Sequence, residues 1–98
     1  MKIDKSKTNG SLTLAISGKL ETMTAPELEK VVKEELSDVT ELIFDLSELE
    51  YISSAGLRVL LSAQKAMNVK GSMKVTGANE MVLEIFEITG FSDILTIE

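Results

Sequence analysis

The fold is decided by residues 41–61, ELIFDLSELEYISSAGLRVLL, where a strand, a polar bend and a helix follow one another. Residues 42–46 form a short apolar run, a pattern typical of a strand buried on both faces. Apolar residues recur at helical spacing from Leu57 onward, which predicts a helix. Ser53 or Ser54 is the expected N-cap, because a serine hydroxyl can accept a hydrogen bond from a free first-turn N–H. The pattern therefore predicts a serine hydroxyl on the surface, at the positive end of a helix.

The N-terminal third of the chain predicts a hairpin followed by a helix. Asn9-Gly10 is a strong tight-turn dipeptide and is placed at or near the hairpin tip. Gly18 is expected to end the second strand, which leaves residues 19–23 as a loop. Thr24 and Glu27 have the spacing of a capping box, so the first helix is expected to begin there.

The C-terminal third predicts two more strands and one more helix. The preceding helix is expected to end at Gly71. A strand over Ser72–Thr76 follows, then a helix opened by Ala78 or Asn79 and closed by Thr89-Gly90, and then a last strand over residues 94–97. The order β-β-α-β-α-β-α-β predicts one α/β domain over residues 1–98, with a mixed, mostly parallel sheet. The loops at 18–23, 47–54 and 77–78 should then meet at one end of the sheet.

Composition excludes several classes of protein. The 98 residues contain 10 Lys plus Arg and 16 Asp plus Glu, which gives a net charge of −6. This acidic balance argues against binding to nucleic acid or to a membrane surface. No apolar run approaches the roughly 20 residues of a membrane span, and residues 1–4 do not open a signal peptide. The expected location is therefore the cytoplasm.

The sequence offers no catalytic equipment. It has no histidine and no cysteine, which removes the commonest acid/base at neutral pH, the commonest metal ligand and any thiolate. No pattern places a lysine beside Ser53 or Ser54, and Ala55-Gly56 does not complete a nucleophile elbow. Neither a glycine-rich phosphate loop nor a metal-ligand spacing is present. We expect no enzyme activity, no metal and no cofactor, and a small hydrolase is a distant third hypothesis.

Residues 45–57, DLSELEYISSAGL, resemble the signature of bacterial anti-sigma-factor antagonists, the single-domain members of the STAS family. The turn at residues 18–21 is similar to the family's Gly-x-Leu-Asp, and Thr89-Gly90-Phe91 is similar to its Thr-Gly-Leu/Phe segment. The similarity extends through essentially the whole chain. It implies a partner switch, in which the unmodified protein binds an anti-sigma factor that is also a serine kinase and so frees a sigma factor. The kinase then phosphorylates the motif serine, and a serine phosphatase reverses the step.

The resemblance places the phosphorylated serine at Ser54, directly before Ala55-Gly56. The sequence departs from the family pattern at two positions. Ser53 stands where the family has an aspartate, which leaves Ser53 as a competing acceptor, and Glu21 replaces the aspartate of the first loop. The expected partner-binding patch consists of Glu21, Thr22, Met23, Ser53, Ser54, Leu57 and Arg58. ATP would belong to the partner kinase.

Several alternatives remain open at the level of sequence. Taken alone, the two serines are explained by a plain helix cap; the preceding strand, the small Ala55-Gly56 pair and the acidic surroundings favour the docking-site interpretation. Met23 either contacts a partner or packs under the first helix, and Arg58 either pairs with a phosphate on Ser54 or is simply solvated. A binding subunit or scaffold of the same fold that is never phosphorylated, as in a lipid-transport or sensory assembly, is the second hypothesis for function.

Overall fold

The computed structural model describes residues 1–98 and contains one four-stranded sheet. The strands are β1 (Lys2–Thr8), β2 (Ser11–Leu20), β3 (Glu41–Ile52) and β4 (Ser72–Thr76), and they lie side by side in that order. β1 is antiparallel to β2, whereas β2, β3 and β4 are parallel to one another. Asn9 and Gly10 form the hairpin tip with φ of 48° and 83°, as the dipeptide predicts. The expected α/β class and mixed sheet are confirmed.

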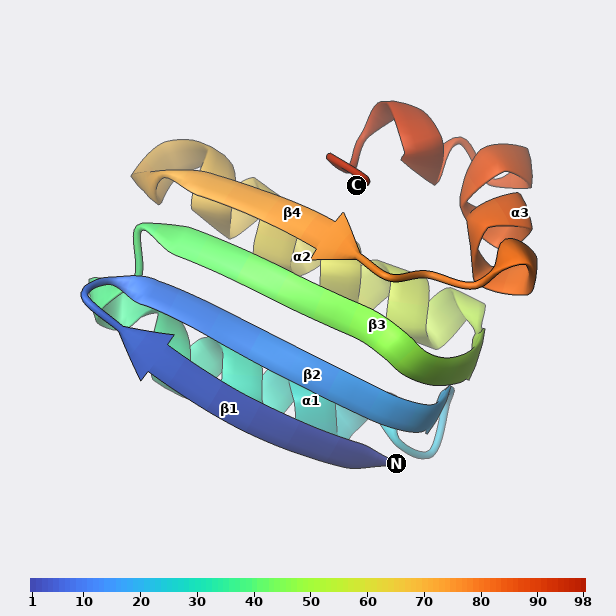
Figure 1. The fold of residues 1–98 in the computed structure, drawn as a ribbon, viewed down its shortest axis with the longest axis horizontal. Helices are drawn as coiled ribbons and strands as arrows, with labels where there is room; N and C mark the ends of the chain where they lie inside the picture. The colour runs from blue at the N-terminus through green and yellow to red at the C-terminus, as the bar shows by residue number, and fades with distance from the viewer.

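The longer helices cover one face of this sheet. Helices α1 (Ala25–Glu35) and α2 (Ser54–Lys70) lie behind the sheet in Figure 1, and helix α3 (Glu80–Ile88) lies beyond the end of β4. Two short 3-10 segments follow α1 and α3, η1 (Leu36–Asp38) and η2 (Phe91–Asp93). None of the helices is both long enough and apolar enough to cross a bilayer.

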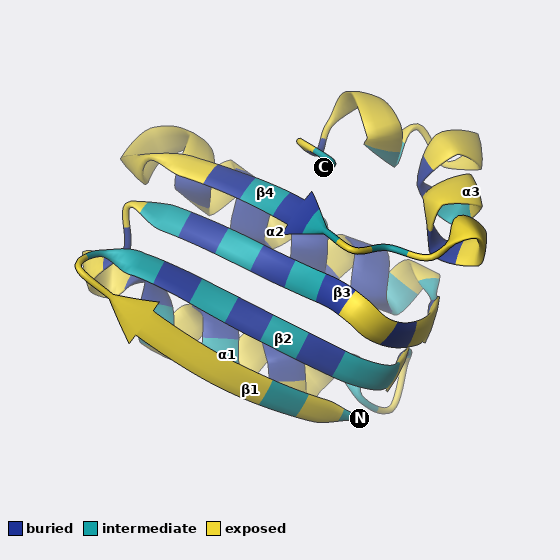
Figure 2. Ribbon diagram, in the orientation of Figure 1, coloured by how far each residue is buried: buried dark blue, intermediate teal, exposed yellow.

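Burial alternates along the central strands, so the prediction that residues 42–46 are buried on both faces was wrong. Leu42, Phe44 and Leu46 are buried toward α1 and α2, whereas Ile43 and Asp45 are only half-buried on the open face. Figure 2 shows this alternation as dark and light bands on β2 and β3. Helices cover only one face of the sheet, and this period-2 pattern is typical of such a sheet.

Two segments predicted as loops are parts of strands. β2 continues through Gly18, which has a φ of 90°, and ends at Leu20. β3 continues through the polar bend to Ile52, so the two strands still pair at Leu20 and Ile52. Register shifts at two places in this ladder absorb the extra residues of β3, as β-bulges do.

The predicted last strand over residues 94–97 was also wrong. Residues Phe91–Asp93 form η2, and only Ile97 pairs with Val75, in a single parallel bridge. That bridge has two hydrogen bonds, from the Val75 N–H to the Thr96 oxygen at 2.8 Å and from the Glu98 N–H to the Val75 oxygen at 2.9 Å. The turn that begins at η2 continues through Ile94 and Leu95, because both of their N–H groups donate to the Phe91 carbonyl oxygen, at 3.0 and 2.8 Å, instead of pairing with β4.

Candidate docking site at the start of helix α2

The ends of β2 and β3 bring two loops together, as the topology predicts. The Ser53 N–H donates to the Leu20 carbonyl oxygen at 2.9 Å, which attaches the start of α2 to the end of β2. The loop after β4 lies at the same end, because the Asn79 side chain donates to the Leu49 carbonyl oxygen at 3.1 Å. Asn79 rather than Ala78 is the N-cap of α3, and its Oδ1 accepts a hydrogen bond from the Val82 N–H at 2.8 Å.

The two serines have different environments. Ser53 is the N-cap residue of α2, but its side chain makes no capping hydrogen bond. The Ser53 Oγ is buried and has no hydrogen-bond partner. Ser54, the first residue of the helix, is exposed. A second molecule can therefore reach the hydroxyl of Ser54 but not that of Ser53 without a rearrangement.

The first turn of α2 is electrostatically positive and uncompensated. It contains no acidic residue, and no side chain caps its N–H groups. The partial positive charge of a helix N-terminus favours an anion placed there. Arg58 lies one turn further along the same helix, is exposed and makes none of the ion pairs found in the structure. The field around Ser54 therefore suits a hydroxyl that acquires negative charge.

The loop after β2 is held by Thr24, in a way that the predicted capping box did not anticipate. The Thr24 Oγ1 accepts a hydrogen bond from the Glu21 N–H at 2.9 Å and donates to the Lys19 carbonyl oxygen at 2.8 Å. Thr24 has helical backbone angles, φ −103° and ψ −20°, whereas a capping residue is usually extended, so its side chain turns back to the loop. The pinned loop leaves Thr22 exposed and Met23 85% exposed, which excludes packing of Met23 under α1.

Leu57 does not belong to the exposed patch. Its side chain is only 5% exposed and forms part of the core, so its predicted role as a direct partner contact was wrong. Leu57 shares the first turns of α2 with Ser54 and Arg58, but it points to the sheet face that α2 covers. Its contribution is to hold the helix against that sheet.

A groove beside Ser54 contributes residues that sequence reasoning missed. It has a volume of about 260 Å³ and is lined by Thr22, Ala25, Pro26, Glu29, Ala55, Arg58 and Val59. The groove exists because α1 and α2 both begin at the carboxyl ends of parallel strands and run side by side. No local motif marks Pro26, Glu29 or Val59, and only the placement of both helices on one face would have identified them.

Other hollows on the molecule lie away from Ser54. One of about 150 Å³ on the open face of the sheet is lined by polar side chains that include Asp4, Ser17 and Asp45. Another of about 310 Å³ separates the C-terminal ends of α1 and α2. No group of three or more histidine, cysteine or acidic side chains is arranged to hold a metal ion.

The chain belongs to the STAS domain family, whose model matches residues 2–98. It is 34% identical over 99 residues to BtrV of Bordetella bronchiseptica, a protein assigned as an anti-sigma factor antagonist, with 99% of this chain and 85% of BtrV covered. It is 32% identical over 98 residues to the anti-sigma-B factor antagonist of Listeria monocytogenes, with 96% and 84% covered. The phosphorylated form of the Bacillus cell fate determinant SpoIIAA has the same fold, with a TM-score of 0.78 at 14% identity over 99% of this chain and 91% of that one.

Within the STAS family, these relatives are assigned as anti-sigma-factor antagonists, the group that the sequence motif indicated. The resemblance of residues 45–57 to anti-sigma-factor antagonists is confirmed by these relatives. The relatives are named as antagonists and not as enzymes, which agrees with the expectation that the chain has no catalytic activity of its own.

Proposed function

We propose that this chain is an anti-sigma-factor antagonist whose docking surface at the start of α2 is switched by phosphorylation of Ser54. The unmodified chain binds an anti-sigma factor that is also a serine kinase and thereby releases a sigma factor in the cytoplasm. Phosphorylation by that kinase ends the binding, and a serine phosphatase restores it. The observation that carries the proposal is the contrast between the exposed Ser54 and the buried Ser53 Oγ.

Charge explains how one phosphoryl group could end the binding without unfolding the domain. A phosphoserine adds about −1.5 to −2 charges at pH 7. At the uncapped first turn of α2, the helix dipole tolerates that charge. At an interface, the same charge must lose its water or face acidic neighbours. A buried, unpaired charge costs several kcal/mol, which corresponds to a loss of affinity of about a thousandfold.

The exposed residues around Ser54 suggest how a partner is held. Met23 is exposed and Ala55 lines the groove, so both offer apolar contact area to a partner at this end of the molecule. Glu29 and Arg58 line the same groove with opposite charges. An apolar side chain of the partner inserted between them would place Ser54 under the partner's surface, where a phosphate is least tolerated.

Incubation with the cognate kinase and ATP tests the proposal. Mass spectrometry should show a gain of one phosphoryl group on Ser54 in the wild type and in Ser53→Ala, and none in Ser54→Ala. In a binding assay, Ser54→Ala should keep the affinity for the kinase and Ser54→Asp should lower it. Equal affinity of the two variants would refute the charge argument.

The same experiment separates the second candidate function. Ser53 stands before Ser54 where the family pattern has an aspartate, and this departure favours a STAS subunit that binds its partner without a phosphorylation cycle. Tight binding with no phosphate on either Ser53 or Ser54 would support that scaffold role, in a lipid-transport or sensory assembly, and would exclude the switch.

A further inference from the structure

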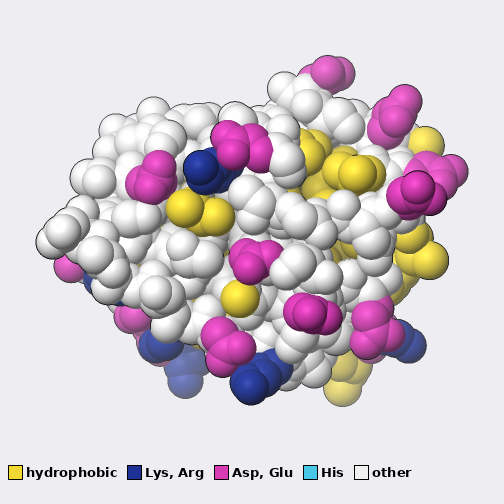
Figure 3. Space-filling model, viewed as in Figure 1, with side chains coloured by type: hydrophobic (Ala, Val, Ile, Leu, Met, Phe, Trp, Pro, Cys, Tyr) yellow, Lys and Arg dark blue, Asp and Glu magenta, His cyan; other side chains and the backbone are white.

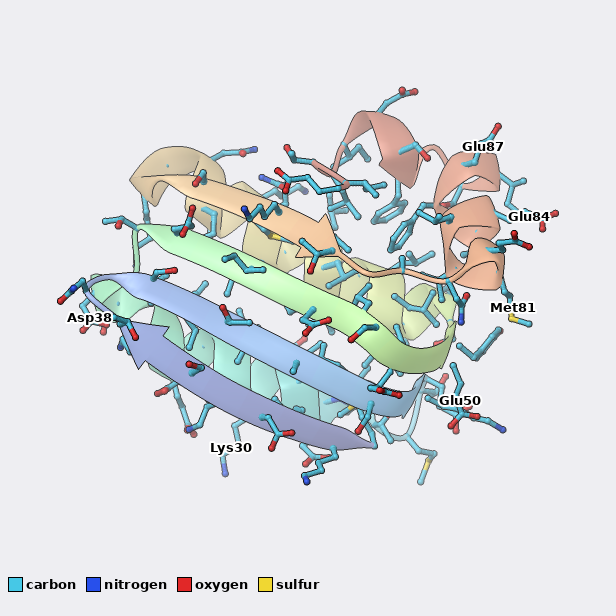
Figure 4. All side chains as sticks on the ribbon, viewed as in Figure 1. Lys30, Asp38, Glu50, Met81, Glu84 and Glu87 are labelled. Atoms are coloured by element: carbon cyan, nitrogen blue, oxygen red, sulfur yellow. The ribbon has the colours of Figure 1, made fainter.

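The outward side of α3 carries large apolar side chains that nothing in the fold covers. Met81 is 54% exposed and Ile88 is 75% exposed, although Val82 and Phe86 on the inward side of the same helix are fully buried. Met81 and Ile88 are seven residues apart, so they lie on the same side of the helix with Glu84 between them. Figure 4 shows Met81, Glu84 and Glu87 all pointing away from the sheet.

The charge around these apolar side chains has a single sign. From Val75 to the end of the chain there is no lysine or arginine, whereas five acidic residues occur there, Glu80, Glu84, Glu87, Asp93 and Glu98. Only Glu98 among them is paired, with Lys74 at 3.6 Å. In Figure 3 the upper right part of the surface, where α3 lies, shows acidic and hydrophobic side chains and no basic ones.

We propose that this outward face, formed by Glu80, Met81, Glu84, Glu87 and Ile88, is a second docking surface whose occupant is a basic amphipathic helix of a partner protein. The occupant is basic because three carboxylates on the face lack any ion pair, and opposite charge on the partner would both steer and orient the encounter. The occupant is helical because Met81 and Ile88 lie two helical turns apart. This spacing matches apolar side chains at positions i and i+7 of a partner helix.

Charge also argues against the other occupants of such a face. A second copy of this chain would place its own three carboxylates opposite these in a symmetric interface, where like charges repel. A lipid surface or a nucleic acid would bring phosphates of the same sign. The proposal does not depend on Ser54 and holds whether or not that residue is phosphorylated.

A synthetic helical peptide provides the test with the full chain. The probe is a leucine-lysine peptide of about 18 residues, long enough to form a helix, with its leucines on one face. A scrambled peptide of the same composition serves as its control. The probe should shift the backbone amide signals of Glu80–Ile88 and η2 and leave those of residues 53–58 unchanged. Glu84→Lys and Ile88→Ser should each weaken binding by about tenfold.

The matched control variant is Val69→Ser. Val69 is 88% exposed on α2, which is more than Ile88 at 75%, and its neighbours Lys65 and Lys70 are basic. The change therefore removes an exposed apolar side chain from basic instead of acidic surroundings. It should leave the affinity for the probe unchanged. Equal binding of the scrambled peptide would overturn the proposal, because charge alone would then explain the attraction. Amide shifts centred on another element, or equal affinities of Glu84→Lys and the wild type, would overturn it as well.

Discussion

The substitution Gly56→Ala tests whether α2 is fixed against the end of β2, on which the presentation of Ser54 depends. A Cβ at residue 56 would lie 2.7 Å from the Leu20 Cγ, 2.9 Å from the Ile52 Cγ1 and 3.0 Å from the Leu20 carbonyl oxygen. Nonbonded carbon atoms prefer separations of about 3.5–4.0 Å. The Leu20 oxygen cannot retreat easily, because it accepts a hydrogen bond from the Ser53 N–H directly after the end of β3. The new methyl group must therefore push the helix outward.

Two opposing terms set the size of the effect. Overpacking of this kind typically costs about 1–3 kcal/mol. Alanine favours a helix over glycine by about 1 kcal/mol, although this gain is smaller in a first turn than in a helix interior. The overpacking term is larger here because three atoms are contacted at once and one of them belongs to the backbone. We expect a net loss of about 1–2 kcal/mol in the free energy of unfolding.

Urea denaturation measures this loss, and Ser62→Ala provides the control. Ser62 is exposed on the same helix, so its replacement changes helix propensity without a new contact and should stabilise the chain by a few tenths of a kcal/mol. Gly56→Ala should also weaken binding to the anti-sigma factor, because the displaced helix moves Ser54 relative to Met23. If Gly56→Ala were as stable as Ser62→Ala, the helix would be free to shift and the close approach would not be a constraint.

Substitutions at three positions, Ser54, Asp38 and Asn79, have expected outcomes that follow from local interactions. Ser54→Asp should keep the free energy of unfolding or raise it by about 0.3–1 kcal/mol, because a carboxylate is favoured at a helix N-terminus; a loss above about 1 kcal/mol on urea denaturation would contradict this. The hydrogen bond from Lys7 lowers the pKa of Asp38 below its ordinary value of 3.8, so its stabilisation is present above that pH and is lost as the pH falls through the folded-state pKa. The stability difference between wild type and Asp38→Asn should therefore vanish in acid, and a difference that is constant with pH would refute the pairing. Asn79→Ala should cost about 1 kcal/mol on thermal or urea unfolding, and Asn79→Asp less, because aspartate still accepts from Val82 although it cannot donate to Leu49; equal losses would show that the cap contributes nothing.

The long end of β3 explains why the sequence predicted a bend where the structure has a strand. From Asp45 to Ile52 the strand advances seven residues, whereas its partner β2 advances five, from Ala15 to Leu20. Two residues of β3 are therefore extra, and the register shifts show where they bulge. The buried positions change from a spacing of two to a spacing of three at Leu46, Leu49 and Ile52. A spacing of three is not a strand pattern, so periodicity alone cannot identify this segment.

The features of the site that the sequence predicted are local ones, and those that it did not predict depend on long-range contacts. The exposure of Ser54 was predicted because a helix start is a local feature that serine, small residues and the following leucines define. The burial of the Ser53 Oγ and of Leu57 was not, because it depends on how closely α2 approaches Leu20 and Ile52. Thr24 illustrates the same limit, since its spacing to Glu27 fits a cap while its hydroxyl is taken by the loop. Local patterns identify which residues begin a helix, but tertiary contacts decide which of their side chains face a partner.

The contacts that hold the site also determine what kind of switch it can be. The start of α2 is held to Leu20 by the Ser53 N–H, and the neighbouring loop is held by hydrogen bonds of the Thr24 hydroxyl with Lys19 and Glu21. A surface fixed in this way loses little conformational entropy when a partner binds. A ligand or modification shifts a conformational equilibrium only by its differential free energy for two states, and these hydrogen bonds favour the one arrangement seen here. The phosphoryl group on Ser54 would therefore act where it stands, by its charge at the interface, and not by reshaping the domain.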